Sequence, residues 1–290
     1  MERSLTPQEQ AIVETLAYYD TFGKSPLTLV ELRRYLFTHH RASATLADLS
    51  GTLGVLRQQG IVAHNNGFWC LQERERLFAV REQGAKEAAL KWKRFSRIAG
   101  FLAYIPFLQA VYVTGSVSIG NAHPKSDIDI LIEARPGHLW TVRMLVTVVS
   151  HLLGRRRYGN TVQNRLCFNH YAISNAPLGP NRVHRVVSSL AIPVWNSSHP
   201  TGHRYALRPR RLLLAARGAL EALLGLTRGH RILEQLCYTL QVRKITSNRH
   251  ERYPEQLGPL TLTTSNLIFY YPRVLLTEQR FKALSTRYTH

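Results

Sequence analysis

Residues 111–134 read VYVTGSVSIGNAHPKSDIDILIEA, and this stretch decides the fold of the middle of the chain. A short apolar strand over 110–113 runs into Thr114-Gly115-Ser116. A turn of ten residues follows, and a second strand begins at Asp127-Ile128-Asp129. The alternation of short apolar strands with helical segments on either side predicts an α/β sheet domain, with polar residues gathered at one end of the sheet.

These polar residues suit the binding of phosphate and metal. Gly115 has no side chain at the point where the backbone would approach a phosphate. Ser116 and the amides after it can donate hydrogen bonds to phosphate oxygens. Asp127 and Asp129 lie two residues apart on a strand, so they point to the same face, about 6.6 Å apart. Two carboxylates in this arrangement can share one or two Mg²⁺ ions.

The order of an apolar strand, Gly115-Ser116, ten residues and Asp127-Ile128-Asp129 resembles the nucleotidyltransferase superfamily typified by DNA polymerase beta. The resemblance covers about residues 96–175. The segments Trp140–Arg143 and Leu166–Asn169 also resemble an uncharacterised prokaryotic subgroup that pairs this domain with an N-terminal winged helix.

The resemblance implies an enzyme that transfers a nucleoside monophosphate from a nucleoside triphosphate to an acceptor and releases pyrophosphate (EC 2.7.7). It implies Mg²⁺ or Mn²⁺ as cofactor, held by the catalytic residues Asp127 and Asp129. The residues expected to bind the nucleotide are Gly115, Ser116, Lys125 and Ser126.

The chain departs from the family pattern on the next strand, where a third carboxylate is expected. Residues 164–173 contain no Asp or Glu, and Asn169 and His170 are the candidates for that position. Glu133 has the correct strand parity, but it lies about 13 Å beyond Asp129, too far to share a metal. Two interpretations stay open: an enzyme that works with two carboxylates, or a degenerate one that binds nucleotide or RNA without turnover.

The charge is distributed unevenly. The formal net charge is +20, yet residues 1–80 hold eight Lys/Arg and eight Asp/Glu. Residues 134–220 contain thirteen arginines, no lysine and no Asp or Glu. Such a composition indicates a polyanionic partner, either nucleic acid or an acidic membrane surface. RNA of a tRNA-like kind is the acceptor that we expect residues 134–220 to contact. The alternatives are a nucleotidyltransferase that modifies a protein and a non-catalytic, nucleic-acid-binding regulatory protein.

The first seventy residues resemble a winged-helix domain. A helix is expected over 7–23 with Thr6 as its N-cap, a second helix carries Leu32, Tyr35 and Leu36, and Ser43 opens a third. A hairpin with Asn65-Asn66-Gly67 as its turn follows. DNA binding by this domain is not favoured because it is neutral, and DNA binding depends on phosphate neutralisation. A structural or docking role is preferred.

We therefore expect a winged-helix-like domain over 1–75, a helical connector over 76–97, a nucleotidyltransferase core over 98–180 and a helical C-terminal region over 181–290. The core is expected to be a small mixed sheet flanked by helices. There is no apolar run long enough for a membrane span and no secretory signal, and three scattered cysteines fit a cytoplasmic protein. Further helices are expected over 96–105, 139–153, 183–190, 210–224 and 230–242, and further strands over 127–132 and 166–173. A final amphipathic stretch covers 275–284.

Overall fold

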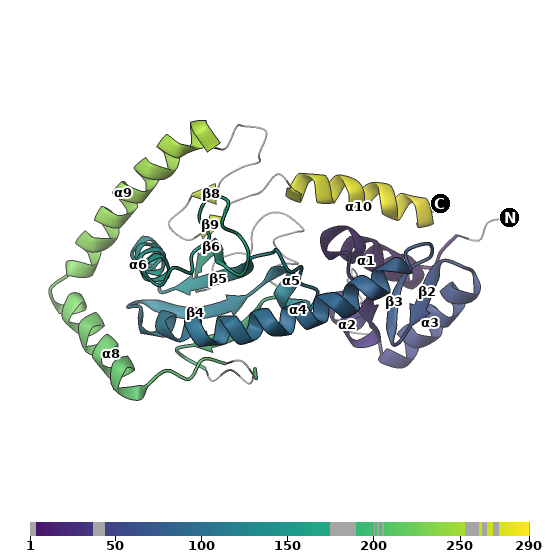
Figure 1. Cartoon of the computed structure of the whole chain (residues 1–290), viewed down its shortest axis with the longest axis horizontal. Coiled ribbons are helices and arrows are strands. Elements are labelled where there is room, and N and C mark those ends of the chain that lie inside the picture. Colours follow the sequence, from purple (N-terminus) through teal and green to yellow (C-terminus); the bar gives the residue numbers. More distant parts are fainter. Residues whose placement is uncertain are drawn as a thin grey trace. The chain divides into compact units, whose positions relative to one another are not determined.

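The computed structural model describes residues 4–36, 44–174, 190–199, 201, 203–204, 206–252, 261–262, 266–268 and 273–289. The chain forms two compact units, one of Met1–Lys86 with Arg273–His290 and one of Glu87–Pro272 (Figure 1). Within the described residues, no helix is long and apolar enough to cross a bilayer. The boundaries at residues 75, 97 and 180 remain predictions.

The first unit contains three helices, a small antiparallel sheet with strand order β1-β3-β2, and the last helix of the chain. Its elements are α1 (Pro7–Gly23), β1 (Leu27–Thr28), α2 (Leu29–Tyr35), α3 (Leu46–Gln58), β2 (Val62–Asn65), β3 (Phe68–Leu71) and α10 (Arg273–Thr289). Asn66 and Gly67 have φ of 49° and 80°, as the expected hairpin turn requires.

The first three helices begin in the same way. Thr6, Thr28 and Thr45 each accept a hydrogen bond from the backbone three residues on, where an acidic side chain returns the bond. These capping boxes satisfy backbone donors that the first turn leaves open. The third helix starts after Thr45, whereas Ser43, the expected opening residue, lies outside the described residues.

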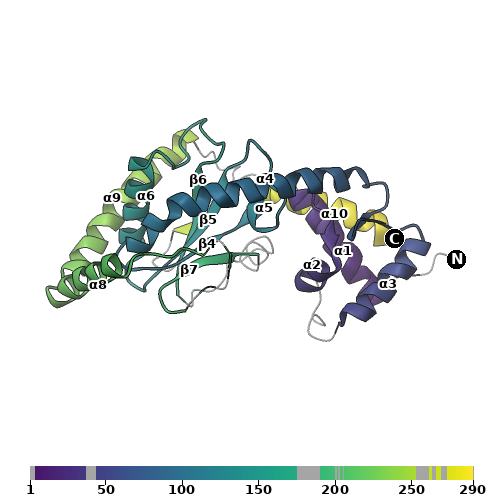
Figure 2. The same cartoon turned by 60° about the horizontal axis from the view of Figure 1, so that its bottom comes forward.

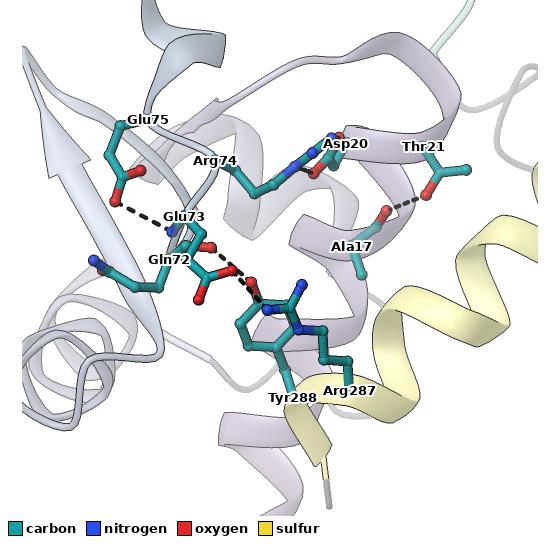
Figure 3. A network of polar contacts seen from close by, with 9 residues as sticks. All are labelled: Ala17, Asp20, Thr21, Gln72, Glu73, Arg74, Glu75, Arg287 and Tyr288. Carbon is teal, nitrogen blue, oxygen red and sulfur yellow. Dashed lines mark hydrogen bonds and ion pairs between the residues drawn. The ribbon is translucent and has the colours of Figure 1, made fainter.

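The last helix, α10, packs on α1 within this unit. The rings of Tyr18 and Phe281 meet edge to face with centroids 5.6 Å apart. Near the end of α10, Arg287 pairs with Glu73 at 2.6 Å, and the Tyr288 hydroxyl donates to the Gln72 carbonyl at 2.6 Å (Figure 3). The sequence predicts a helical C-terminal region with an amphipathic stretch over 275–284, but it does not suggest that this stretch belongs with the N-terminal unit.

The second unit is built on a six-stranded sheet with the order β7-β4-β5-β6-β9-β8. The strands are β4 (Leu108–Val113), β5 (Ile128–Ala134), β6 (Leu166–Ile173), β7 (Ile192–Asn196), β8 (Thr261–Leu262) and β9 (Asn266–Ile268). The β5–β6 pair is parallel, and the pairings of β4 with β5 and β7, of β6 with β9 and of β8 with β9 are antiparallel. This confirms the expected mixed α/β fold, whereas β7, β8 and β9 lie in a region for which the sequence predicts helices.

Helices cover this sheet. They are α4 (Arg76–Ile98), whose residues from Glu87 on belong to this unit, the 3₁₀ helix η1 (Ala99–Tyr104), α5 (Gly115–Ser118), α6 (Leu139–Leu152), α8 (Arg211–Leu226) and α9 (Gly229–Arg252). Phe95 of α4, Val113 of β4 and Trp140 of α6 are buried in one hydrophobic core. Figure 2 shows α9 beside α6 on the outer side of the unit.

Two of the expected helices differ in type along their length or lie outside the described residues. The helix expected over 96–105 consists of two parts: α4 ends at Ile98, and a 3₁₀ helix follows over Ala99–Tyr104. Pro106 lies just beyond it, and a residue before proline is disfavoured in α-helical geometry. Of the helix expected over 183–190, only Leu190 is described.

Candidate active site

The two aspartates lie at the start of β5, beside the end of β4. The Thr114 amide donates to the Asp129 carbonyl at 2.9 Å, which fixes the end of one strand against the start of the other. Side-chain atoms of Asp127, Asp129 and Cys167 all lie within 4.8 Å of one another. The carboxylate pair is therefore brought together, with the thiol of the neighbouring strand β6 beside it.

Gly115 lies against the carboxylate of Asp129. Its φ of +65° is a left-handed conformation that favours glycine. A Cβ at this position would overlap Oδ2 of Asp129 and come within 3.2 Å of its Cγ. The structure thus explains why position 115 needs a glycine. The carboxylate of Asp129 occupies the space that a side chain would need.

Each aspartate has a nitrogen donor beside it. Arg157 donates through Nη1 to Oδ2 of Asp127 at 2.6 Å, and Asn169 donates through Nδ2 to Oδ1 of Asp129 at 3.0 Å. Burial, reinforced by the nearby charge of Asp127, raises the pKa of Asp129, and Arg157 opposes that shift. Two carboxylates this close repel each other, so the pair favours a bound cation.

Arg157 lies at the site although no sequence motif marks it. It follows α6 and ends the run Arg155-Arg156-Arg157, and its backbone amide donates to the Leu166 carbonyl at 3.0 Å. The run was counted only as part of the basic stretch 134–220. The sequence did contain a signal for this residue. The basic run precedes β6, and β6 pairs with β5, the strand that carries the aspartates.

The other expected nucleotide-binding residues lie in the turn between the strands. Ser116 belongs to the short helix α5, and its carbonyl accepts from the Asn121 amide at 2.9 Å. Lys125 is exposed. The Ser126 hydroxyl donates to the His123 carbonyl at 2.9 Å. Ser116, Lys125 and Ser126 therefore lie on one connection, which leads directly into Asp127.

Lys91 of α4 holds this connection in place. Its side chain is fully buried, and Nζ donates to the carbonyls of Pro124 and Ser126 and to Oδ1 of Asn164 at 3.2, 2.7 and 3.0 Å. Burial lowers the pKa of Lys91, although three oxygens accept its protons. The backbone amide of Asn164 also donates to the Ser126 carbonyl at 3.0 Å. Lys91 thus ties α4 to the segments that precede β5 and β6.

The residues considered for the third position lie at different places along β6. Asn169 contacts Asp129, as described above. His170 is buried and lies opposite Leu131, beyond a break in the β5–β6 register. Cys167 lies opposite Asp129 in that register. Glu133 accepts a hydrogen bond from the Tyr112 hydroxyl at 2.9 Å. It lies farther along β5 than Asp129.

The donor set fits a hard divalent cation better than a soft one. Carboxylate oxygens are the ligands that Mg²⁺ and Mn²⁺ prefer, and an amide oxygen is compatible with them. The Cys167 thiol is a soft ligand and adds little for such an ion. Asp127 and Asp129 are the two residues suited to hold it.

Comparison with known proteins agrees with this site. Residues 93–156 match a family model described as "Nucleotidyltransferase domain". No curated protein and no solved structure matches the chain. The matched segment contains Gly115, Asp127 and Asp129 and ends one residue before Arg157. The second unit of this chain therefore contains a nucleotidyltransferase domain, the domain of a transferase that acts on a nucleotide substrate.

Proposed function

We propose that this protein is a metal-dependent nucleotidyltransferase that transfers a nucleoside monophosphate from a nucleoside triphosphate to a hydroxyl of RNA and releases pyrophosphate. The observation that carries the proposal is the pairing of Asp127 and Asp129 beside Gly115, within a segment that matches the nucleotidyltransferase domain. Asp127 and Asp129 are the proposed metal ligands. When bound, Mg²⁺ or Mn²⁺ would neutralise phosphate charge and activate the attacking hydroxyl.

The protein's own residues position the reactants. The turn that carries Ser116, Lys125 and Ser126 supplies hydroxyl, amide and ammonium donors for a triphosphate. Arg157, now paired with Asp127, is a further cation at this point. Asn169 orients the Asp129 carboxylate through its hydrogen bond. His170 stays an alternative group for the third position.

An RNA acceptor is supported by the part of the basic stretch that lies near the site. Arg155 is exposed, Arg165 is partly exposed, and both adjoin the β5–β6 end that carries the aspartates. The Ile128 amide donates to the Arg165 carbonyl at 2.8 Å. By contrast, Arg143 and Arg217 are engaged inside the unit by Gln241 and Glu221. The proposed phosphate contacts are therefore those next to β5 rather than all thirteen arginines.

The test is incorporation of labelled nucleotide into RNA. Purified protein is incubated with each labelled triphosphate, total RNA and Mg²⁺, and the labelled product is separated on a gel. Asp127→Asn with Asp129→Asn should lower incorporation by at least about a hundredfold, because removal of metal ligands removes the charge that catalysis needs. Glu82→Gln, which changes a carboxyl group whose side chain is 74% exposed on α4, is the matched control.

The other outcomes decide between the alternatives. Label on protein instead of RNA would favour a protein-modifying transferase. RNA binding that survives loss of both aspartates, without incorporation of any nucleotide, would show a degenerate, regulatory protein. We propose that residues 1–75 form a winged helix with a docking role, since residues 1–80 hold eight Lys/Arg and eight Asp/Glu, and that the protein acts in the cytoplasm.

A further inference from the structure

Helix α8 has Arg217 and Glu221 on its inner side and several leucines on its outer side. Arg217 is buried and donates to Glu221 at 2.7 Å and to the carbonyls of Ala103 and Leu108 at 2.7 and 2.5 Å. Glu221 also accepts from the Phe107 amide at 2.7 Å. Arg217 and Glu221, on the polar face of this helix, are thus hydrogen-bonded within their own unit.

The opposite face is apolar. Leu212, Ala216, Ala219, Leu223 and Leu226 follow one another at intervals of four and three residues, a spacing that puts them on one side of a helix. Leu212, Leu223 and Leu226 are 81%, 57% and 85% exposed. We call these five residues the outer leucine face. A row of exposed leucines of this kind indicates an interaction surface.

The next helix repeats the arrangement. Glu234 of α9 accepts hydrogen bonds from the amides of Trp140 and Thr141 at 2.9 and 2.8 Å, which fixes α9 to the start of α6. On α9, Ile232 and Leu236 are 73% and 54% exposed. Helices α8 and α9 therefore direct Glu221 and Glu234 inward and present aliphatic side chains outward.

The charge of this region is complementary to an anionic surface. Between residues 134 and 250 the sequence has two carboxylates, Glu221 and Glu234, and both are engaged inside the unit. Exposed cations lie at both ends of α8: Arg208, Arg210 and Arg211 at its start, and Arg228 and Arg231 after its end. Leucines bordered by arginines at both ends, with no outward carboxylate from α8 or the start of α9, are suited to an anionic apolar partner.

We propose that the outer leucine face binds the surface of a membrane that contains anionic phospholipid. The leucines would enter the boundary between headgroups and acyl chains, and the flanking arginines would contact lipid phosphates. RNA fits this face less well because aliphatic side chains offer no stacking surface for bases. A second copy fits less well because antiparallel pairing would bring arginines from both ends together.

Docking through this face leaves the active site accessible. In both Figure 1 and Figure 2, α8 lies at the end of the second unit that is remote from α5. The start of β5, with Asp127 and Asp129, adjoins α5. A protein bound by α8 would therefore present its nucleotide site away from the lipid.

The experiment is sedimentation of the full-length protein with vesicles of phosphatidylcholine alone and of phosphatidylcholine with phosphatidylglycerol in roughly equal amounts. The expected result is binding to the mixed vesicles, weakened by added salt, and little binding to phosphatidylcholine alone. Leu223→Gln with Leu226→Gln should weaken it at least about tenfold. Arg228→Gln with Arg231→Gln should weaken it about fivefold for each arginine removed.

Val30→Gln is the control for the leucine changes, because Val30 is 65% exposed on α2 of the other unit. Circular dichroism of each variant establishes that it is folded, and light scattering gives its oligomeric state. Absence of binding by the wild type overturns the proposal. So does binding that depends on the arginines but survives loss of the leucines, which marks a general polyanion site. A wild-type dimer that becomes monomeric on Leu223→Gln with Leu226→Gln, without vesicle binding, would show an interface between two copies.

Discussion

At the scale of single residues, the site depends on how closely Gly115 approaches Asp129. Gly115→Ala would place a methyl group on the carboxylate, at a backbone conformation that alanine disfavours. We expect a loss of about 2–4 kcal/mol in stability or a displaced Asp129, and nucleotide incorporation reduced by about a hundredfold. Thermal unfolding and the incorporation assay measure the two effects.

Gly137→Ala is the matched control for this change. Gly137 has a comparable φ of +77°, but nothing lies within 4 Å of the position where its Cβ would stand. The Gly137→Ala variant should lose about 1 kcal/mol of stability from backbone conformation alone and keep its activity. Equal effects of the two substitutions on incorporation would contradict a specific role for the Gly115–Asp129 contact.

Lys91 is the second residue whose contribution to the site's framework can be tested by substitution. Lys91→Met keeps the length of the buried side chain but leaves the carbonyls of Pro124 and Ser126 without their donor. We expect the free energy of unfolding to fall by about 2–4 kcal/mol, because buried polar groups lose their partners. Lys86→Met on the same helix, where the side chain is 67% exposed, should change stability by less than about 0.5 kcal/mol. Urea titration of the three proteins checks this, and similar midpoints for all of them would refute it.

At the scale of elements, α10 completes the first unit although it is the last element in the chain. Phe281 is 5% exposed and meets Tyr18 of α1 edge to face. Phe281→Ala should destabilise the first unit by about 3 kcal/mol, because it leaves a cavity under α10. Limited proteolysis should then cut within residues 4–36 sooner than in the wild type. Arg280→Ala, at an exposed neighbouring position, should leave the digestion pattern unchanged.

At the scale of the whole molecule, the net charge of +20 is concentrated outside residues 1–80. If Arg155 and Arg165 contact acceptor RNA, Arg155→Gln with Arg165→Gln should raise the KM for RNA about tenfold. The slope of log affinity against log salt should become shallower by about one unit for each lost phosphate contact. Filter binding across a salt series measures this slope. Arg76→Gln, an exposed position at the start of α4, should show neither change.

The sequence by itself determined the part of this protein that depends on local spacing. The β4–turn–β5 segment, the glycine before the turn and the two aspartates are close in sequence, so strand periodicity was enough to bring them together. The caps at Thr6 and the hairpin turn at Asn66-Gly67 were also predictable, because such signals act within four residues.

Only the tertiary structure decided which distant groups meet that site. Arg157 and Asn169 are 30 and 40 residues from the aspartates they contact, and Lys91 is 35 residues from Ser126. Their contacts follow from the parallel β5–β6 pairing and the packing of α4, which no local pattern encodes. The same holds for α10, whose Tyr288 bonds a residue 216 positions earlier. Side chains that meet through packing are selected by the shape of the whole core, so their partners appear only once the chain has folded.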